Sequence, residues 1–143
     1  MFESYFKKYL EDFAGNPKPL WNYEAGVTLL GAKAMYEVTG DEEYYQRIVE
    51  HMDHDIRPVG TIRSLDVNER NLDKINSGKI LFYLDEKTGE QRYMTALKTL
   101  VDLLHKHPRT STGNFWHKEI YPYQIWLDGL YMGLPLYLEY ETK

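Results

Sequence analysis

Apolar residues recur at helical spacing along nearly the whole chain. In the stretch 22–38, for example, Val27, Leu30, Ala34 and Val38 return every three or four residues, which places them on one face of a helix. The alternation of apolar and polar residues that marks a half-buried strand is nearly absent. The sequence therefore predicts an all-α protein.

Turn-forming residues divide this pattern into six predicted helices. A breaker rich in Gly and Pro at 15–19 follows the first helix. Thr-Gly pairs at 39–40 and 88–89 end the second and fourth helices, and Asp41 caps the third. An irregular stretch follows Pro58, and a loop is predicted over 108–122. The predicted helices span about 2–13, 22–38, 41–55, 72–86, 90–105 and 124–140.

The chain contains an internal repeat. Residues 39–44, TGDEEY, and 88–93, TGEQRY, form the same turn 49 residues apart, and each turn follows an acid by fifteen residues. These acids are Glu24 and Asp73, and a third copy of the pattern begins at Asp128. The sequence thus predicts one domain over 1–143 built from helical hairpins at about 22–56 and 72–106, with an incomplete copy at 124–143.

Hairpins of this length can stack into an open solenoid or close into a ring, whereas the period excludes tetratricopeptide repeats. In a closed ring the inner helices run parallel, so the residues of their first turns meet at one end. Glu24, Asp73 and Asp128 all lie in such first turns. The positive end of a helix dipole also favours acids there, so their positions alone leave both a structural and a functional explanation open.

Composition narrows the function classes. The formal charge is −5, from 17 Lys plus Arg against 22 Asp plus Glu, which argues against nucleic acid as a partner. The chain has no Cys, which excludes thiolate metal sites and cysteine nucleophiles. It has no run of apolar residues long enough to span a membrane and no signal peptide pattern, so we expect a cytoplasmic protein without a membrane partner.

Metal and cofactor chemistry find little support. His51, His54 and Asp55 could present ligands from one helix, but no H-E-x-x-H pattern is present, and surface histidines on an acidic helix are usually solvated. Nucleotide-binding glycine loops and the serine-hydrolase elbow are also missing from the sequence. We therefore expect neither a metal nor a cofactor.

Carbohydrate chemistry fits the residues that remain. Aromatic residues make up 15% of the chain, and their rings stack on sugar faces, while carboxylates supply the protons of glycoside chemistry. The segment 103–118 contains no acid, and its last part, GNFWHK, combines aromatic and cationic groups in a loop. The candidates are Asp73, Asp128, Tyr23, Trp116 and Trp126.

Four segments resemble the successive motifs of glycoside hydrolase family 105, the unsaturated rhamnogalacturonyl hydrolases, which are related to the family 88 unsaturated glucuronyl hydrolases. They are WNYEAG at 21–26, LDKINSGK at 72–79, FWHK at 115–118 and QIWLDGLYMG at 124–133. The resemblance covers essentially the whole chain. It implies an (α/α)6 barrel of six hairpins, of which these residues supply roughly the first half.

The resemblance also implies a reaction and a set of roles. The substrate class is a disaccharide from pectin that ends in an unsaturated uronic acid, and the enzyme hydrates the C4=C5 vinyl ether. Asp128 matches the general acid and base, with a pKa that we expect apolar, aromatic surroundings such as Trp126 and Leu127 to raise. Asp73 matches the second acid. The residues expected to contact the substrate are Tyr23, His117, Lys118, Trp126 and, from stacking alone, Trp116.

The length of the chain opens alternatives to an active enzyme. Six repeats of about 50 residues would exceed 300 residues, so we expect a fragment, a truncated gene product or half of a split barrel. An uncovered helix over 131–140 predicts self-association, or a second chain that completes the barrel. A noncatalytic helical-repeat binding module and an inactive truncated remnant are the alternative functions.

Overall fold

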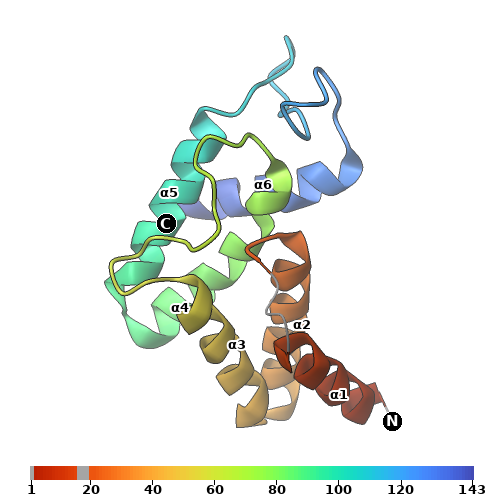
Figure 1. The fold of residues 1–143 in the computed structure, drawn as a ribbon, viewed down its shortest axis with the longest axis vertical. Coiled ribbons are helices and arrows are strands. Elements are labelled where there is room, and N and C mark those ends of the chain that lie inside the picture. Colours follow the sequence, from red (N-terminus) through yellow and green to blue (C-terminus); the bar gives the residue numbers. More distant parts are fainter. Residues whose placement is uncertain (1, 16–19) are drawn as a thin grey trace.

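The computed structural model describes residues 2–15 and 20–143, and these residues form helices joined by loops (Figure 1). Most of the predicted breaker, residues 16–19, lies outside the described residues. Within the described ranges no helix is both long and apolar enough to cross a bilayer. The all-α prediction is confirmed, with α1 at Phe2–Gly15, α2 at Tyr23–Thr39, α3 at Glu42–Asp55, α4 at Lys79–Thr88, α5 at Gln91–His105 and α6 at Leu127–Thr142.

The repeated Thr-Gly turn has the same structure in both copies. Gly40 and Gly89 adopt φ angles of 70° and 68°, the left-handed conformation that glycine tolerates best, and their N–H groups close the ends of α2 and α4. The preceding threonine hydroxyls each donate to a carbonyl four residues back and accept the N–H two residues on. Asp41 caps α3 as predicted, accepting from the N–H of Glu43 at 3.0 Å.

The prediction of one helix over 72–86 is wrong in its first half. Two short 3₁₀ helices, η1 at Leu72–Lys74 and η2 at Asn76–Gly78, precede α4. The side chain of Asn76 donates to the carbonyl of Tyr23 at 3.0 Å, and the hydroxyl of Ser77 donates to that of Asn22 at 2.5 Å. Side chains that bind backbone groups of another segment favour such irregular turns over a continuous α-helix.

The last helix also begins later than predicted. Gln124 does not enter α6, because its carbonyl accepts the N–H of His117 at 2.8 Å and so holds residue 124 in the loop. The helix begins at Leu127, which leaves Asp128 in its first turn. This shift preserves the equivalence between Asp128 and the acids of the other two repeats.

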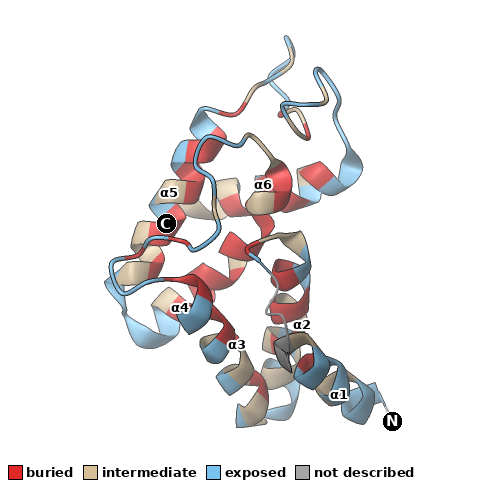
Figure 2. Cartoon of the chain, in the orientation of Figure 1, coloured by how far each residue is buried: buried red, intermediate tan, exposed pale blue. Residues whose placement is uncertain are grey.

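The helices pack as hairpins around a shared row of inner segments. α3 packs on α2 and α5 packs on α4, while η2 contacts α2, α4, α5 and α6. Buried residues gather on the sides of the helices that face one another (Figure 2). Tyr44 and Tyr93, which occupy the same position in the two copies of the turn, are both fully buried. The two hairpins therefore use one packing scheme twice.

Glycine permits the closest approach between the inner segments. A Cβ atom on Gly26 of α2 would lie 2.8 Å from backbone atoms of both Asn76 and Ser77, closer than real Cβ atoms approach. Gly78 is similarly enclosed by the side chains of Leu100 and Leu136. The contact between α2 and η2 thus depends on the absence of a side chain at position 26.

We predict that Gly26→Ala lowers the free energy of unfolding by about 1–3 kcal/mol, the usual cost of overpacking, because the added methyl group meets backbone that cannot rotate away. Gly31→Ala in the same helix is the control: its Cβ would meet only the tip of the Phe6 ring, at 3.2 Å, and alanine favours the helix. Chemical denaturation measures both variants. Equal stability of the two would show that the Gly26 contact has no importance.

Candidate functional site

Asp73 is the most enclosed acid of the predicted site. It lies in η1, where its N–H donates to the side chain of Asn71 at 3.0 Å, and its side chain is only 10% exposed. One carboxylate oxygen pairs with Nζ of Lys118 at 2.6 Å. The other lies 3.6 Å from Nε2 of His117. Asp73 therefore meets both cation-capable residues of the predicted FWHK segment.

Backbone hydrogen bonds bring that loop to Asp73. The N–H of Leu72 donates to the carbonyl of His117 at 3.1 Å, and the N–H of Glu119 donates to the carbonyl of Arg70 at 2.9 Å. Together they form a short antiparallel contact centred on Asn71 and Lys118. Because the contact uses backbone groups, it fixes His117 and Lys118 beside η1 whatever their side chains do.

His117 lies in an aromatic stack at the start of α6. Its ring is stacked on Trp126 with centroids 4.3 Å apart, and Trp126 is stacked in turn on Tyr121 at 5.3 Å. Gly129 leaves room for the imidazole, because a Cβ there would lie 2.7 Å from Nδ1 of His117. Trp126 thus stacks with two protein rings, and its contact with His117 orients the imidazole.

Asp128 lies next to the same histidine but faces solvent. Its Oδ1 accepts the N–H of Gly129 at 2.8 Å, and its charge acts on the pKa of His117 together with that of Asp73. His117 therefore lies between the two acids that the sequence predicts as catalytic. The structure brings Asp73 and Asp128 to one end of the inner segments.

Tyr23 joins this end from α2. The pKa of its hydroxyl is raised, chiefly by the neighbouring charge of Glu24, and Asp73 and Lys118 are close enough to act on it as well. Glu24 itself accepts a hydrogen bond from the side chain of Asn22 at 2.5 Å. The first turns of α2, η1 and α6 thus converge, as the repeat predicts.

The pKa values of His117 and Lys118 shift in opposite directions. Burial lowers the pKa of His117, and the nearby charges of Asp73 and Asp128 oppose this. Burial also disfavours the charged form of Lys118, but its hydrogen bond to Asp73 outweighs this and raises the pKa of the ammonium group. The site accordingly holds a neutral imidazole beside a firmly paired cation.

Two residues of the predicted site, Trp116 and Leu127, do not have the surroundings that the sequence predicts. Trp116 packs against Tyr123, with ring centroids 4.7 Å apart, and its backbone N–H donates to the carbonyl of Pro108. No contact between described residues joins Trp116 to either acid. Leu127 is 87% exposed and gives Asp128 no apolar cover. Sequence reasoning missed Tyr121, whose only signal is its place five residues before Trp126.

His51, His54 and Asp55 form a separate group on α3, in which His51 is buried and the side chain of His54 is 44% exposed. Asp55 is buried, and its two carboxylate oxygens lie 3.2 Å from Nε2 of His51 and 2.9 Å from Nδ1 of His54. The ring of Phe13 stacks on His51. Across residues 2–15 and 20–143, no group of three or more His, Cys, Asp or Glu side chains has an arrangement that could hold a metal ion.

The fold and the converging acids define a class of helical-hairpin protein with carboxylates, a histidine and a lysine gathered at the first turns of its inner segments. Comparison with known families agrees with this architecture. The profile of Glycosyl Hydrolase Family 88 matches residues 2–143, so the chain belongs to this family.

Two relatives show how much of the family domain these residues represent. The chain is 29% identical over 119 residues to the unsaturated rhamnogalacturonyl hydrolase YesR of Bacillus subtilis (strain 168), covering 79% of this chain and 33% of YesR. A solved structure of a family 105 glycoside hydrolase from C. acetobutylicum ATCC 824 is 42% identical, with a TM-score of 0.86 over 96% of this chain and 38% of that chain. This chain therefore spans between a third and two fifths of these relatives.

We predict that the free energy of unfolding falls as the pH is lowered from about 7.5 to about 5.5. Burial lowers the pKa of both His117 and His107, so in this range the unfolded chain takes up protons that the folded chain does not. The stability is therefore complete above the unfolded pKa of about 6.5 and declines below it.

His107→Gln should reduce this decline by at most about 1.4 kcal/mol per pH unit. Glutamine can still donate to the carbonyl of Trp116, which accepts from Nε2 of His107 at 2.7 Å. Denaturant unfolding at the higher pH measures any loss of packing, so the difference between the two pH values isolates protonation. If the free energy of unfolding of the variant falls as much between the two pH values as that of the parent, the prediction is contradicted.

Proposed function

We propose that this chain supplies part of the catalytic site of a glycoside hydrolase that acts on unsaturated uronic-acid disaccharides derived from pectin, in the cytoplasm. The observation that carries the proposal is the convergence of Asp73, Asp128 and Tyr23, from three repeats, around His117 and Lys118. Membership of Glycosyl Hydrolase Family 88 and similarity to YesR support the substrate class.

In the proposed reaction Asp128 is the general acid. It protonates C4 of the vinyl ether, which leaves positive charge shared between C5 and the ring oxygen, and the carboxylate then takes a proton from the water that adds at C5. The hemiketal that results opens and releases the neighbouring sugar. Asp128 suits this exchange because it faces solvent and, among the described residues, its carboxylate accepts a hydrogen bond only from the N–H of Gly129.

Asp73 and Lys118 have a different proposed role. Asp73 already accepts a hydrogen bond from Lys118, so the pair offers a fixed acceptor and a fixed donor to sugar hydroxyls or to a carboxylate. His117 adds a second donor or acceptor whose orientation the stack with Trp126 maintains. Tyr23 forms the wall on the α2 side. Catalysis then depends on placement of the ring under Asp128.

Because the chain spans 38% of the C. acetobutylicum relative, the test joins residues 1–143 to the remaining portion of that relative. We predict that the hybrid consumes an unsaturated rhamnogalacturonan disaccharide, followed as loss of the ultraviolet absorbance of the double bond. Asp128→Asn should lower kcat by about 10²–10⁴-fold, the range for loss of a general acid.

Asp102→Asn on the exposed side of α5 is the matched control and should leave the rate unchanged. Full activity of the Asp128→Asn hybrid would refute the assigned acid. A hybrid that binds the disaccharide equally well with Asn or Asp at position 128, and never forms product, would favour the noncatalytic binding module.

We also propose that a second copy of this chain covers the exposed side of α6. Leu127, Tyr131, Leu134 and Leu138 are exposed at intervals of four, three and four residues and so form one apolar stripe. A complementary stripe of exposed aromatic residues lies on α1, at Phe2, Tyr5 and Tyr9.

Sedimentation at micromolar concentration should therefore give a mass above that of one chain. Replacing Leu134 and Leu138 by Glu should shift the chain toward the monomer, because charge would have to be buried in the contact. Val59→Glu, at an exposed loop position, is the control. A parent chain that sediments as a monomer and binds no apolar dye would overturn this proposal.

A further inference from the structure

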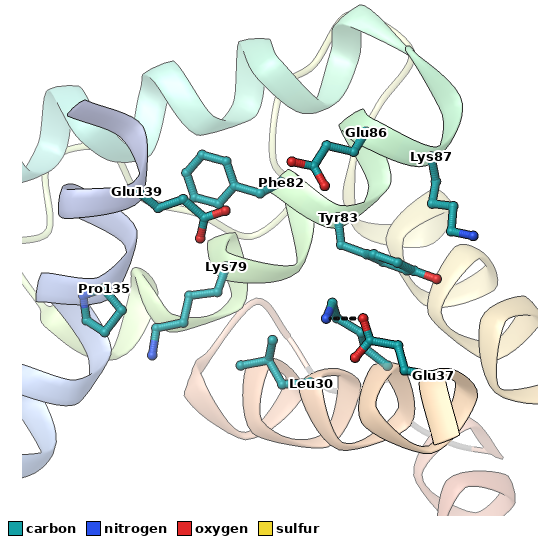
Figure 3. Close-up of a pocket in the computed structure, with 10 residues that line it drawn as sticks. Leu30, Glu37, Lys79, Phe82, Tyr83, Glu86, Lys87, Pro135 and Glu139 are labelled. Carbon is teal, nitrogen blue, oxygen red and sulfur yellow. Dashed lines mark hydrogen bonds and ion pairs between the residues drawn. The ribbon is translucent and has the colours of Figure 1, made fainter. Parts of the chain in front are cut away.

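A groove of about 480 Å³ runs between α2, α4 and α6, the three helices that continue from the converging first turns (Figure 3). Leu30 lines it from α2, Lys79 from α4 and Pro135 from α6. Its volume is within the range of pockets that hold small ligands. The groove is not used by the proposed chemistry at Asp128.

The spacing along each element places this groove about two helical turns from the proposed site. Leu30 follows Tyr23 by seven residues and Pro135 follows Asp128 by seven, which is about two turns of an α-helix and returns to the same face. Lys79 follows Asp73 by six residues, and two turns of 3₁₀ helix lie between them. A ligand beneath Asp128 would therefore meet the layer that contains Lys79.

The acids of the groove already have cationic partners. Glu37 pairs with Lys33 at 2.6 Å, as the dashed line in Figure 3 marks, and Lys143 pairs with Glu86 and, at 3.4 Å, with Glu139. These pairs largely balance the charge of the groove's carboxylates. They also leave no groove acid in contact with Lys79 among the described residues.

Lys79 has a different environment. Its Nζ donates to the backbone carbonyl of Tyr131 at 2.6 Å and lies 3.5 Å from the centre of the Tyr131 ring. The described residues place no carboxylate within ion-pair distance of it, and burial lowers its pKa to about 8. An ammonium group has three N–H donors, so two remain for a ligand, and a carboxylate would supply the missing counter-charge.

We propose that Lys79 binds the carboxylate of a uronic acid in the groove between α2, α4 and α6. The identity of the sugar rests on the proposed function, whereas the preference for a carboxylate rests on the groove itself. A carboxylate could also come from an acidic side chain of a second copy. The groove lies on the same helices as Tyr23 and Asp128, two turns further along each, and this favours the sugar.

The test measures binding without catalysis. Isothermal titration compares galacturonate with galactose, which has the same ring but a neutral CH₂OH group where galacturonate has its carboxylate. The parent chain should prefer galacturonate, and Lys79→Met should weaken galacturonate binding about tenfold while leaving galactose unaffected. Lys98→Met, exposed on α5, is the matched control and should bind as the parent does.

A second measurement follows Lys79 directly. In a chain labelled with ¹³C-lysine, the Cε signal lost in Lys79→Met identifies the residue, and its midpoint of titration should rise when galacturonate is present. Equal binding of galacturonate by the parent and Lys79→Met, or a midpoint that galacturonate does not move, would overturn the proposal. A midpoint that rises only with protein concentration would assign the carboxylate to a second copy and also overturn it. Neither result depends on Asp128, so a failed rate assay leaves this test intact.

Discussion

The buried turn at Asn76–Gly78 is the contact on which the other parts of the structure depend. Asn76 and Ser77 donate to carbonyls at the start of α2, and Gly26 lets the two segments approach until their backbones nearly touch. The same turn packs against α5 and α6. Polar side chains with no exposure are stable only when they are hydrogen-bonded, so this turn fixes the distance and the register of the inner segments together.

This register explains why acids far apart in the sequence share one neighbourhood. Asp73 precedes the turn by three residues, and its place next to α2 follows from the bonds of Asn76 and Ser77. The loop that supplies His117 and Lys118 is attached to the same segment by backbone bonds at Leu72. The site is thus built from backbone contacts first, and the pairing of Lys118 with Asp73 is added to an arrangement already fixed.

Much of the fold could be predicted from local signals. Gly40, Gly89 and Asp41 act through their own conformation or nearest neighbours, so the helix ends they mark are found where the sequence places them. The two 3₁₀ turns could not be found in this way, because Asn76 and Ser77 leave the helical pattern in order to bind carbonyls more than 50 positions away in the sequence. The pattern of neighbouring residues in the sequence cannot reveal a partner so far away.

The residues of the candidate site likewise fall into those that local sequence signals predict and those that depend on tertiary contacts. The repeat alone brings Glu24, Asp73 and Asp128 into one end, and the structure confirms that convergence. The direction in which a ring on a loop points depends on tertiary contacts, which local sequence does not reveal. Trp116 therefore packs against Tyr123, whereas Tyr121 stacks on Trp126. The roles of these residues toward a sugar remain predictions.

The two-turn spacing from Tyr23 to Leu30 and from Asp128 to Pro135 limits how such a chain can vary in length. Each residue of an α-helix advances the side chain by about 100°, so one insertion within α2 or α6 would turn every later position away from the groove. Insertions and deletions are tolerated only where no such rotation is transmitted. In this chain those places lie in the connections over 56–71 and 106–126, outside the backbone contact that holds His117 and Lys118 beside η1.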